Sequence, residues 1–271
     1  MTQKNDLFEG GNVFKGPDKQ PLTQRIATSD VPATIAYIEK ITGLDFTAET
    51  GEDKKPVKWL GTTGRKEDPD GTFELNSSGD LDLSVDANEV DKKEFATKLA
   101  QQFGKENVKL SGDSVHLKTP IKGDEANGFV QADFMFSTNP KFQQGSMIGG
   151  SKTYRGEHRH ILLSSIARAR GMKYSPKFGL VDPETNEPVP GGDDWNTIAK
   201  QLLGQTASLK DIRSVENIIS YIKKLPNYEE LISAAQETLG RSGIELPKKE
   251  ALEHYTPNSP SWMRRIIDIV S

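Results

Sequence analysis

Two aspartates, Asp80 and Asp82, are the most informative chemical groups in this sequence of 271 residues, and they follow a Ser-Ser-Gly turn. Polar and apolar residues alternate through the segment Asp-Leu-Asp-Leu-Ser-Val at 80–85. Side chains of a strand point to alternate faces, so both carboxylates would share one face while the apolar residues pack against a core. Two such anions repel each other unless a cation lies between them, and Mg²⁺ prefers oxygen ligands. The segment therefore predicts part of a site for two Mg²⁺ ions, with Mn²⁺ as a substitute.

A third carboxylate, Asp133, lies in the apolar segment 128–136. Alternation along this expected strand places Gln131 and Asp133 on one face and the apolar residues on the other. An ionised carboxylate on a central strand is costly to bury without a partner. One interpretation is a solvent-facing residue of an edge strand, and the other is a third ligand of the same metal site. The presence of Asp80 and Asp82 favours the second.

A glycine-rich turn, Gly61-Thr62-Thr63-Gly64, follows an expected short strand at 57–60. Glycines allow backbone N–H groups to turn toward a ligand, and threonine hydroxyls add hydrogen-bond donors. Arg65 and Lys66 then add positive charge. The combination is suited to phosphate oxygens, although a plain turn after a strand has the same composition.

The elements that must position these groups follow from hydrophobic periodicity and capping residues. In the first half of the chain we expect a helix from Ser29 to Gly43, a helix over 91–103, strands over 108–110 and 114–118, and a strand over 128–136. Residues 137–156 are expected to be a glycine-rich connector. Beyond it we expect helices over 157–170, 193–204, 214–225, 227–240 and from Ser259, with hairpin strands over 177–181 and 188–190.

The order of these features resembles the nucleotidyltransferase superfamily of DNA polymerase beta. The segment Ser77-Ser78-Gly79-Asp80-Leu81-Asp82 is similar to the palm motif of family-X DNA polymerases. The helix ending at Gly171, the hairpin after it and the proline-flanked loop near 188–190 look like the thumb of that family. The resemblance covers roughly residues 57–204, and a polar insertion at 67–76 lengthens the distance between turn and aspartates.

The resemblance implies roles for individual residues. Asp80 and Asp82 would bind both metal ions, and Asp133 would bind the catalytic ion that activates the attacking hydroxyl. The triphosphate would lie against Gly61, Thr62, Thr63, Ser78 and Gly79, with Arg65 or Lys66 neutralising it. Tyr154 would lie beside the nucleotide sugar, and one helical face carrying Glu157, His160 and Ser164 would line the base pocket.

The histidines offer a weaker site. His158 and His160 are two residues apart on an expected helix, so their side chains diverge by about 200° and one ion cannot easily take both. His116 is interpreted as a solvated or site-flanking residue, and His254 as an ordinary surface residue. The sequence has no Gly-Lys-Ser/Thr phosphate loop and no serine nucleophile elbow.

Composition sets the remaining bounds. The net charge is −4, 27% of the residues are charged, and the sequence contains no cysteine. No apolar run is long enough to span a membrane, and the first residues lack the apolar core of a signal peptide. We therefore expect a cytoplasmic protein without disulfides that does not interact with membranes.

These observations predict an α+β fold. Its expected parts are an N-terminal arm (1–28), a nucleotidyltransferase palm with a mixed sheet and flanking helices (29–150), a thumb-like subdomain (151–204) and a helical C-terminal region (205–271). The expected activity is metal-dependent transfer of a nucleoside monophosphate from an NTP or dNTP to a hydroxyl, most simply a nucleic-acid 3′ end, as in a minimal family-X-like DNA polymerase. The alternatives are nucleotidylation of a protein or small molecule, and a non-catalytic nucleotide-binding or nucleic-acid-binding relic of the fold.

Overall fold

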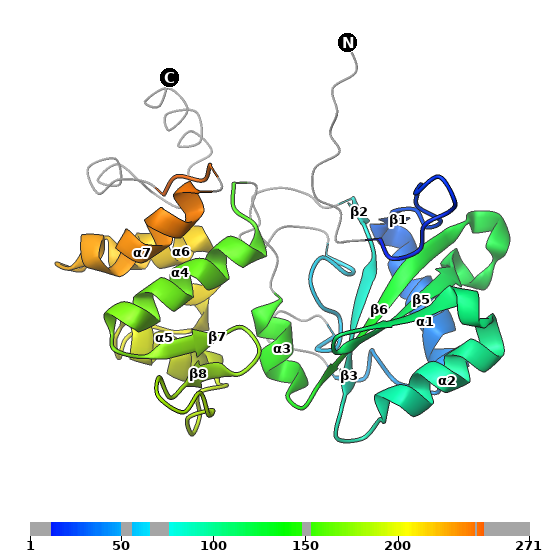
Figure 1. The fold of residues 1–271 in the computed structure, drawn as a ribbon, viewed down its shortest axis with the longest axis horizontal. Helices are drawn as coiled ribbons and strands as arrows, with labels where there is room; N and C mark the ends of the chain where they lie inside the picture. Colours follow the sequence, from blue (N-terminus) through cyan, green and yellow to red (C-terminus); the bar gives the residue numbers. More distant parts are fainter. Residues whose placement is uncertain (1–11, 50–55, 66–75, 148–152, 242, 247–271) are drawn as a thin grey trace, which may run out of the picture. The chain divides into compact units, whose positions relative to one another are not determined.

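The computed structural model describes residues 12–49, 56–65, 76–147, 153–241 and 243–246. The chain divides into two compact units, Met1–Met147 and Ile148–Ser271, here called the first and the second unit (Figure 1). The first contains a mixed sheet with helices, and the second is mainly helical. The predicted α+β class is confirmed, while the assignment to a nucleotidyltransferase palm remains a prediction.

The first unit is built on four strands, β3 (Leu81–Asp86), β4 (Val108–Ser111), β5 (Ser114–Pro120) and β6 (Phe129–Ser137). Their order in the sheet is β3-β6-β5-β4, with β3 parallel to β6 and the other pairs antiparallel. Strand β6, which carries Asp133, therefore lies inside the sheet. The interpretation of Asp133 as an edge-strand residue is wrong.

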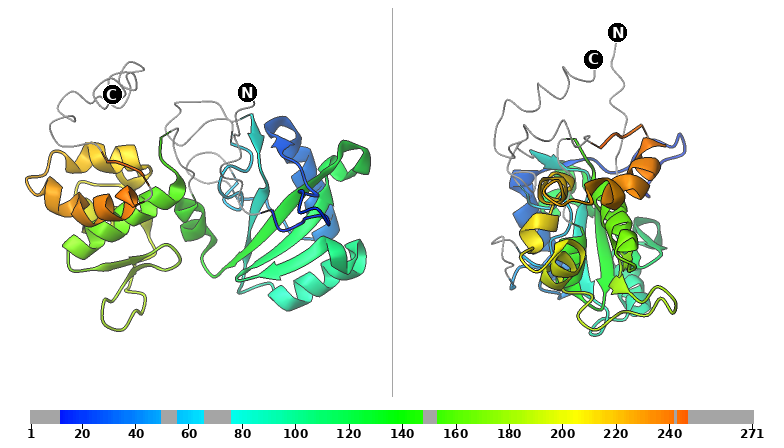
Figure 2. Two further views of the ribbon diagram at one scale, coloured as in Figure 1. Left: turned by 45° about the horizontal axis from the view of Figure 1, so that its top comes forward. Right: turned by 90° about the vertical axis from the view of Figure 1, so that its left-hand side faces the viewer.

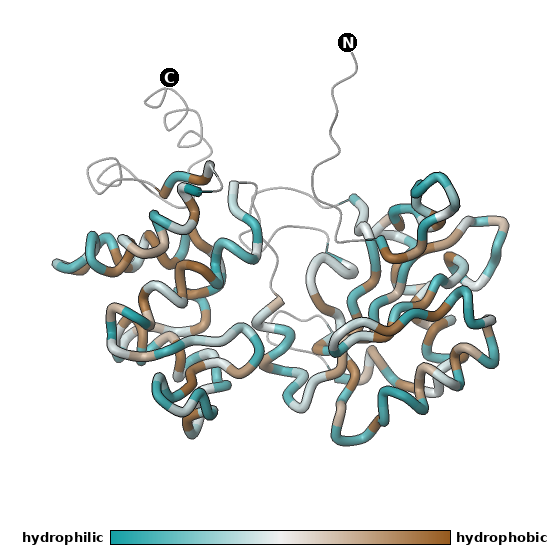
Figure 3. Tube along the Cα trace, viewed as in Figure 1, coloured by the Kyte–Doolittle hydropathy of each residue, from teal (hydrophilic) through white to brown (hydrophobic). Residues whose placement is uncertain are grey.

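One face of the sheet is apolar and is covered by α1 (Val31–Thr42) and α2 (Lys92–Phe103), whose buried residues join those of the strands in one core (Figure 2). Both helices were expected from their sequence patterns. Helix α1 ends at Gly43, which takes the left-handed φ of 72° that glycine tolerates. Helix α2 begins after Asp91, whose carboxylate accepts the N–H groups of Lys93 and Glu94. Figure 3 shows hydrophobic and hydrophilic segments mixed along the chain, in keeping with elements that have one buried face.

The described part of the N-terminal segment is integrated into the first unit. Strand β1 (Ile26–Ala27) pairs antiparallel with β2 (Ser77–Ser78). The side chains of Phe14 and Ile26 are buried, with 1% and 0% of their surface exposed. The irregular lead-in expected from composition thus packs against the element that precedes Asp80.

Two expectations in the first unit differ from the structure. Residues 57–60 form no full strand, and only Trp59 makes an isolated bridge, to Leu83, before the chain turns at Gly61. The connector 137–156 contains a helix, α3 (Pro140–Ser146), which begins after Asn139. Asn139 accepts the N–H of Phe142, and proline suits the first helical position, so this short helix starts despite its glycine content.

The second unit contains four of the expected helices and a small antiparallel sheet. The helices are α4 (Gly156–Ala169), α5 (Trp195–Leu203), α6 (Val215–Ile222) and α7 (Tyr228–Gly240), and the strands are β7 (Lys173–Ser175) and β8 (Gly179–Val181). The expected hairpin had its strands on either side of 182–186. In the structure β7 pairs with β8 instead, and Val181 makes only an isolated bridge to Pro188.

Short 3-10 helices complete the described elements: η1 (Thr28–Asp30), η2 (Lys105–Asn107), η3 (Ile121–Gly123), η4 (Glu125–Asn127) and η5 (Leu209–Ile212). The expected helix from Ser259 lies outside the described residues, as does His254. Among the described helices, none has both the length and the apolar composition that crossing a bilayer requires.

Candidate metal centre

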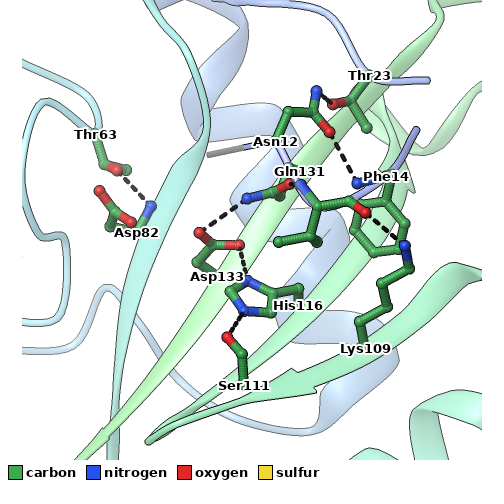
Figure 4. Close-up of polar contacts among 11 residues, drawn as sticks. Asn12, Phe14, Thr23, Thr63, Asp82, Lys109, Ser111, His116, Gln131 and Asp133 are labelled. Atoms are coloured by element: carbon green, nitrogen blue, oxygen red, sulfur yellow. Dashed lines mark hydrogen bonds and ion pairs between the residues drawn. The ribbon is translucent and has the colours of Figure 1, made fainter. Parts of the chain in front are cut away.

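The polar face of the first unit's sheet carries one row of chemically active side chains. Asp82 on β3 is directly opposite Asp133 on β6, Asp133 is opposite His116 on β5, and His116 is opposite Lys109 on β4. Directly opposed residues project from the same face of a sheet. Four adjacent strands therefore place two carboxylates, an imidazole and an ammonium group side by side (Figure 4).

Three carboxylates form the acidic end of this row. Oxygen atoms of Asp80, Asp82 and Asp133 lie within 4.8 Å of one another, and each side chain is partly buried. No other group of at least three possible ligands of this kind occurs among the residues that the structure describes. These aspartates could bind a metal ion, as the spacing of Asp80 and Asp82 and the strand position of Asp133 predicted.

The electrostatics of the cluster fit a cation. Burial raises the pKa of the Asp82 carboxyl well above its usual range, and the nearby charges of Asp80 and Asp133 raise it further. Like charges held this close disfavour ionisation, whereas a bound divalent ion would favour it. An all-carboxylate set of oxygen donors suits hard ions such as Mg²⁺ or Mn²⁺.

The glycine-rich turn is joined directly to the aspartate strand. The Asp82 N–H donates to Thr63 Oγ1 at 2.8 Å, and the Leu60 N–H donates to the Asp82 carbonyl at 2.9 Å. The hydroxyls of Thr62 and Ser78 are 2.7 Å apart. The turn and the motif before Asp80 therefore form one local structure, although residues 65–76 separate them in sequence.

Gly61 is required at this point for two reasons. Its φ of +54° lies in the left-handed region, and a Cβ atom built on it would lie 2.8 Å from Asp82 Oδ2. A side chain here would therefore displace the carboxylate. The glycine lets the turn approach the candidate metal centre closely.

The structure separates the predicted phosphate ligands into two groups. Gly61, Thr62 and Gly79 are partly exposed. Thr63, Arg65 and Ser78 are buried, with 1%, 4% and 2% of their surface exposed, and so they support the turn from within. Lys66 lies outside the described residues.

Arg25 is a cation beside the Ser-Ser-Gly turn that sequence reasoning missed. Its side chain is exposed, and Nε and Nη2 donate to the hydroxyl and carbonyl of Ser77, each at 3.1 Å. A Cβ atom on Gly79 would lie 3.4 Å from Arg25 Nη1. No local signal identifies Arg25, because only the pairing of β1 with β2 brings it to this turn.

Two further side chains, whose hydrogen bonds to Asp133 were not predicted, surround this carboxylate. His116 Nδ1 is 2.7 Å from Asp133 Oδ1, and Gln131 Nε2 donates to Asp133 Oδ2 at 3.0 Å. His116 and Gln131 are 7% and 2% exposed. The interpretation of His116 as solvated is wrong, and it does flank the site. The signal in the sequence was a histidine on an expected strand. Its position beside Asp133 could be inferred only once the order of the strands in the sheet was known.

The remaining predicted nucleotide-binding residues belong to the second unit. Tyr154 is buried there, its hydroxyl donates to the Glu245 carbonyl at 3.3 Å, and burial raises its pKa above the usual range, with a smaller effect from Glu216. Tyr154 therefore lies in the interior of the second unit, and its contact with a nucleotide stays a prediction. Glu157 is exposed and forms an ion pair with Arg155 at 3.3 Å.

His160 and Ser164 line a cavity of about 300 Å³ in the second unit. Helix α7 contributes Ala234 and Thr238 to the same cavity. His160 is also tied to β7, since its Nδ1 lies 2.9 Å from the Tyr174 hydroxyl and the two rings are stacked. His158 instead accepts the Arg155 N–H through Nδ1 at 3.0 Å, so the two histidines have separate partners, as their spacing suggested.

Comparison with known proteins adds no family. No family model matches the chain, and no curated protein or solved structure is significantly similar to it. The class that fold and site define is therefore an α+β protein whose mixed sheet presents three clustered aspartates beside a glycine-rich turn.

Proposed function

We propose that the protein is a magnesium-dependent nucleotidyltransferase. It would transfer a nucleoside monophosphate from an NTP or dNTP to a hydroxyl group, with a nucleic-acid 3′ end as the favoured acceptor, as in a minimal family-X-like DNA polymerase. The observation that carries this proposal is the cluster of Asp80, Asp82 and Asp133 next to the turn at Gly61. The similarity of Ser77–Asp82 to the family-X palm motif agrees with it.

The reaction is an in-line substitution at phosphorus. The acceptor hydroxyl gives up its proton to water, its oxygen forms a bond to the α-phosphorus, and the bond from that phosphorus to the bridging oxygen breaks so that pyrophosphate leaves. Two Mg²⁺ ions, for which Mn²⁺ can substitute, would supply charge stabilisation for the attacking and leaving oxygens. Asp80 and Asp82 would hold both ions, and Asp133 would hold the one next to the acceptor.

The other residues of the first unit would bind and orient the nucleotide. The partly exposed turn residues Gly61, Thr62 and Gly79 offer backbone N–H and hydroxyl groups to phosphate oxygens. Arg25, fixed by its hydrogen bonds to Ser77, would neutralise phosphate charge at the same turn. Fixed donors of this kind stabilise charge without reorganising during the reaction.

Incorporation of labelled nucleotide tests the proposal. A panel of single-stranded and primed-template substrates, each with dNTPs or NTPs and with Mg²⁺ or Mn²⁺, would reveal both the acceptor and the need for a template. Asp82→Asn should reduce incorporation to background while the circular dichroism spectrum stays unchanged. Full incorporation by the folded Asp82→Asn protein would overturn the proposal.

A second acceptor class is favoured by charge. The net charge of −4 gives little general attraction for a nucleic-acid backbone. Transfer to a protein or small-molecule hydroxyl uses the same metal centre and the same bond changes. Label appearing in protein or small molecules, with none on nucleic acid, would identify this class. If calorimetry shows no Mg²⁺-dependent NTP binding, the fold is a non-catalytic relic instead.

A further inference from the structure

Both carboxylate oxygens of Asp133 receive a hydrogen bond from a buried side chain. His116 Nδ1 contacts Oδ1 at 2.7 Å, and Gln131 Nε2 contacts Oδ2 at 3.0 Å (Figure 4). Each carboxylate oxygen has two lone pairs, so each still has one available for another partner. The two contacts therefore fix the plane of the carboxylate and leave it able to bind an ion.

The orientation of the Gln131 amide is fixed by the N-terminal segment. The Val13 N–H donates to Gln131 Oε1 at 2.9 Å, and a backbone N–H can meet only the oxygen of the amide. The amide nitrogen must then face Asp133, where it acts as a donor. Lys109 Nζ also donates to the Val13 carbonyl, so β4 holds the same segment in place.

The orientation of His116 is fixed in a similar way. An ionised carboxylate only accepts hydrogen bonds, so the ring nitrogen facing Asp133, Nδ1, must carry a proton. The other ring nitrogen, Nε2, lies 2.6 Å from the exposed hydroxyl of Ser111. A buried ring held at both nitrogens has little freedom to rotate away from Asp133.

We propose that His116 and Gln131 are positioning residues that hold Asp133 as a metal ligand. The inference rests on the proposed function, because it concerns the ion that the transfer would use. Partners that orient a metal ligand commonly change metal affinity by about 10–100-fold when removed. They are therefore expected to set how tightly the centre binds its ion, while contacts to the nucleotide are made elsewhere.

Titration of the full chain with Mn²⁺ alone, followed by electron paramagnetic resonance of free Mn²⁺, tests this inference without the reaction. His116→Ala and Gln131→Met should each weaken Mn²⁺ binding by about 10–100-fold. His116→Asn should restore much of the affinity, because an asparagine amide can place an N–H near the position of Nδ1. Leu110→Ala is the control and should leave affinity nearly unchanged, because Leu110 is exposed and lies opposite Val115 on the apolar face, away from His116 and Asp133.

A second readout separates positioning from a general structural effect. The metal concentration that gives half-maximal nucleotide incorporation should rise in parallel with the Mn²⁺ dissociation constant, and the rate should recover at saturating metal. A purely structural role would lower the melting temperature of the metal-free protein and leave the metal-dependence curve in place. If His116→Ala fails to fold, Gln131→Met decides, because it removes the donor to Asp133, together with the acceptor of the Val13 N–H, at nearly constant volume.

The two proposals fail in different ways. Wild-type affinity for Mn²⁺ in both His116→Ala and Gln131→Met would overturn the positioning role, while transfer activity would still stand. A wild-type protein that binds Mn²⁺ but transfers no nucleotide would overturn the proposed function, while the positioning role would survive. Asp82→Asn, which removes a ligand itself, supplies the baseline for absent binding in both cases.

Discussion

The two faces of the sheet in the first unit are made from the same strands, but one packs into the core and the other carries the candidate metal centre. On the face covered by α1 and α2, Leu81, Leu83 and Phe134 are fully buried. On the other face, Asp82 and Asp133 hold like charges close together. Burial of apolar surface stabilises the fold, whereas clustered anions oppose it until a cation binds. Substitutions on the apolar face should therefore lower stability, whereas only substitutions on the polar face should change metal binding directly.

The largest change in stability is expected on the apolar face. Leu83→Ala removes a fully buried side chain and should lower the free energy of unfolding by about 2–5 kcal/mol. Leu110→Ala is the matched control, because Leu110 is 53% exposed and its loss should matter by less than about 0.5 kcal/mol. Urea denaturation followed by circular dichroism measures both. Leu110 lies in the same cross-strand row of the apolar face as Leu83, but on the exposed strand β4, so equal effects would contradict the burial of Leu83 in the core.

Gly61→Ala tests the close approach of the turn to the polar face. A left-handed φ costs a non-glycine residue about 1–2 kcal/mol, and the new Cβ would also push against Asp82 Oδ2. Gly43→Ala has a similar φ of +72° but meets no atom within 4 Å. Both variants should lose comparable stability, and only Gly61→Ala should also lose Mn²⁺ affinity and nucleotide transfer. Unchanged Mn²⁺ affinity in Gly61→Ala would show that the close approach of the turn does not affect metal binding by the aspartates.

The two faces of the sheet also differ in how much of each could be predicted from the sequence. The apolar face follows from periodicity and caps, so α1 and α2 were expected nearly at their observed bounds. Asp80 and Asp82 lie in one local motif, and their carboxylates do lie close together, although Asp80 precedes the first residue of β3. Asp133 could be added because its strand has a clear pattern, although only the strand order excludes an edge position.

The partners of these groups could not be predicted, because they come from distant segments. Arg25 reaches the turn through the β1–β2 pair, and Gln131 is oriented by Val13. A polar, glycine-rich lead-in carries no periodic signal, so its packing is visible only in three dimensions. Conversely, Tyr154 was assigned to the nucleotide from the resemblance alone, and the structure buries it in the second unit.

Arg25→Ala tests the cation beside the turn that precedes Asp80. Because Arg25 is exposed, its loss should change the free energy of unfolding by less than about 1 kcal/mol. A charge-assisted hydrogen bond to phosphate contributes about 1.5 kcal/mol or more, which corresponds to a roughly tenfold increase in the KM for the nucleotide. Lys40→Ala removes an exposed cation from α1, on the apolar side, and should leave KM unchanged. Steady-state incorporation kinetics would distinguish the two, and an equal KM for both variants would remove Arg25 from the site.

The last prediction concerns the stability cost of the aspartate cluster itself. The pKa of Asp82 is raised in the folded protein by burial and by the charges of Asp80 and Asp133. A raised folded-state pKa means that the folded state binds a proton more tightly than the unfolded state, so stability falls as pH rises from the ordinary aspartate range through the raised value. Asparagine does not titrate. In a chelator, Asp82→Asn should therefore match the wild type at acid pH and become the more stable protein as pH increases.

Metal should reverse this order, because a bound cation stabilises the ionised cluster and Asp82→Asn cannot bind it well. Melting temperatures measured across pH, with EDTA and then with excess Mn²⁺, test both signs in one series. A wild type that is more stable than Asp82→Asn at neutral pH in EDTA would show that the polar face stabilises the fold without a cation. The polar face would then stabilise the fold by itself, as the apolar face does.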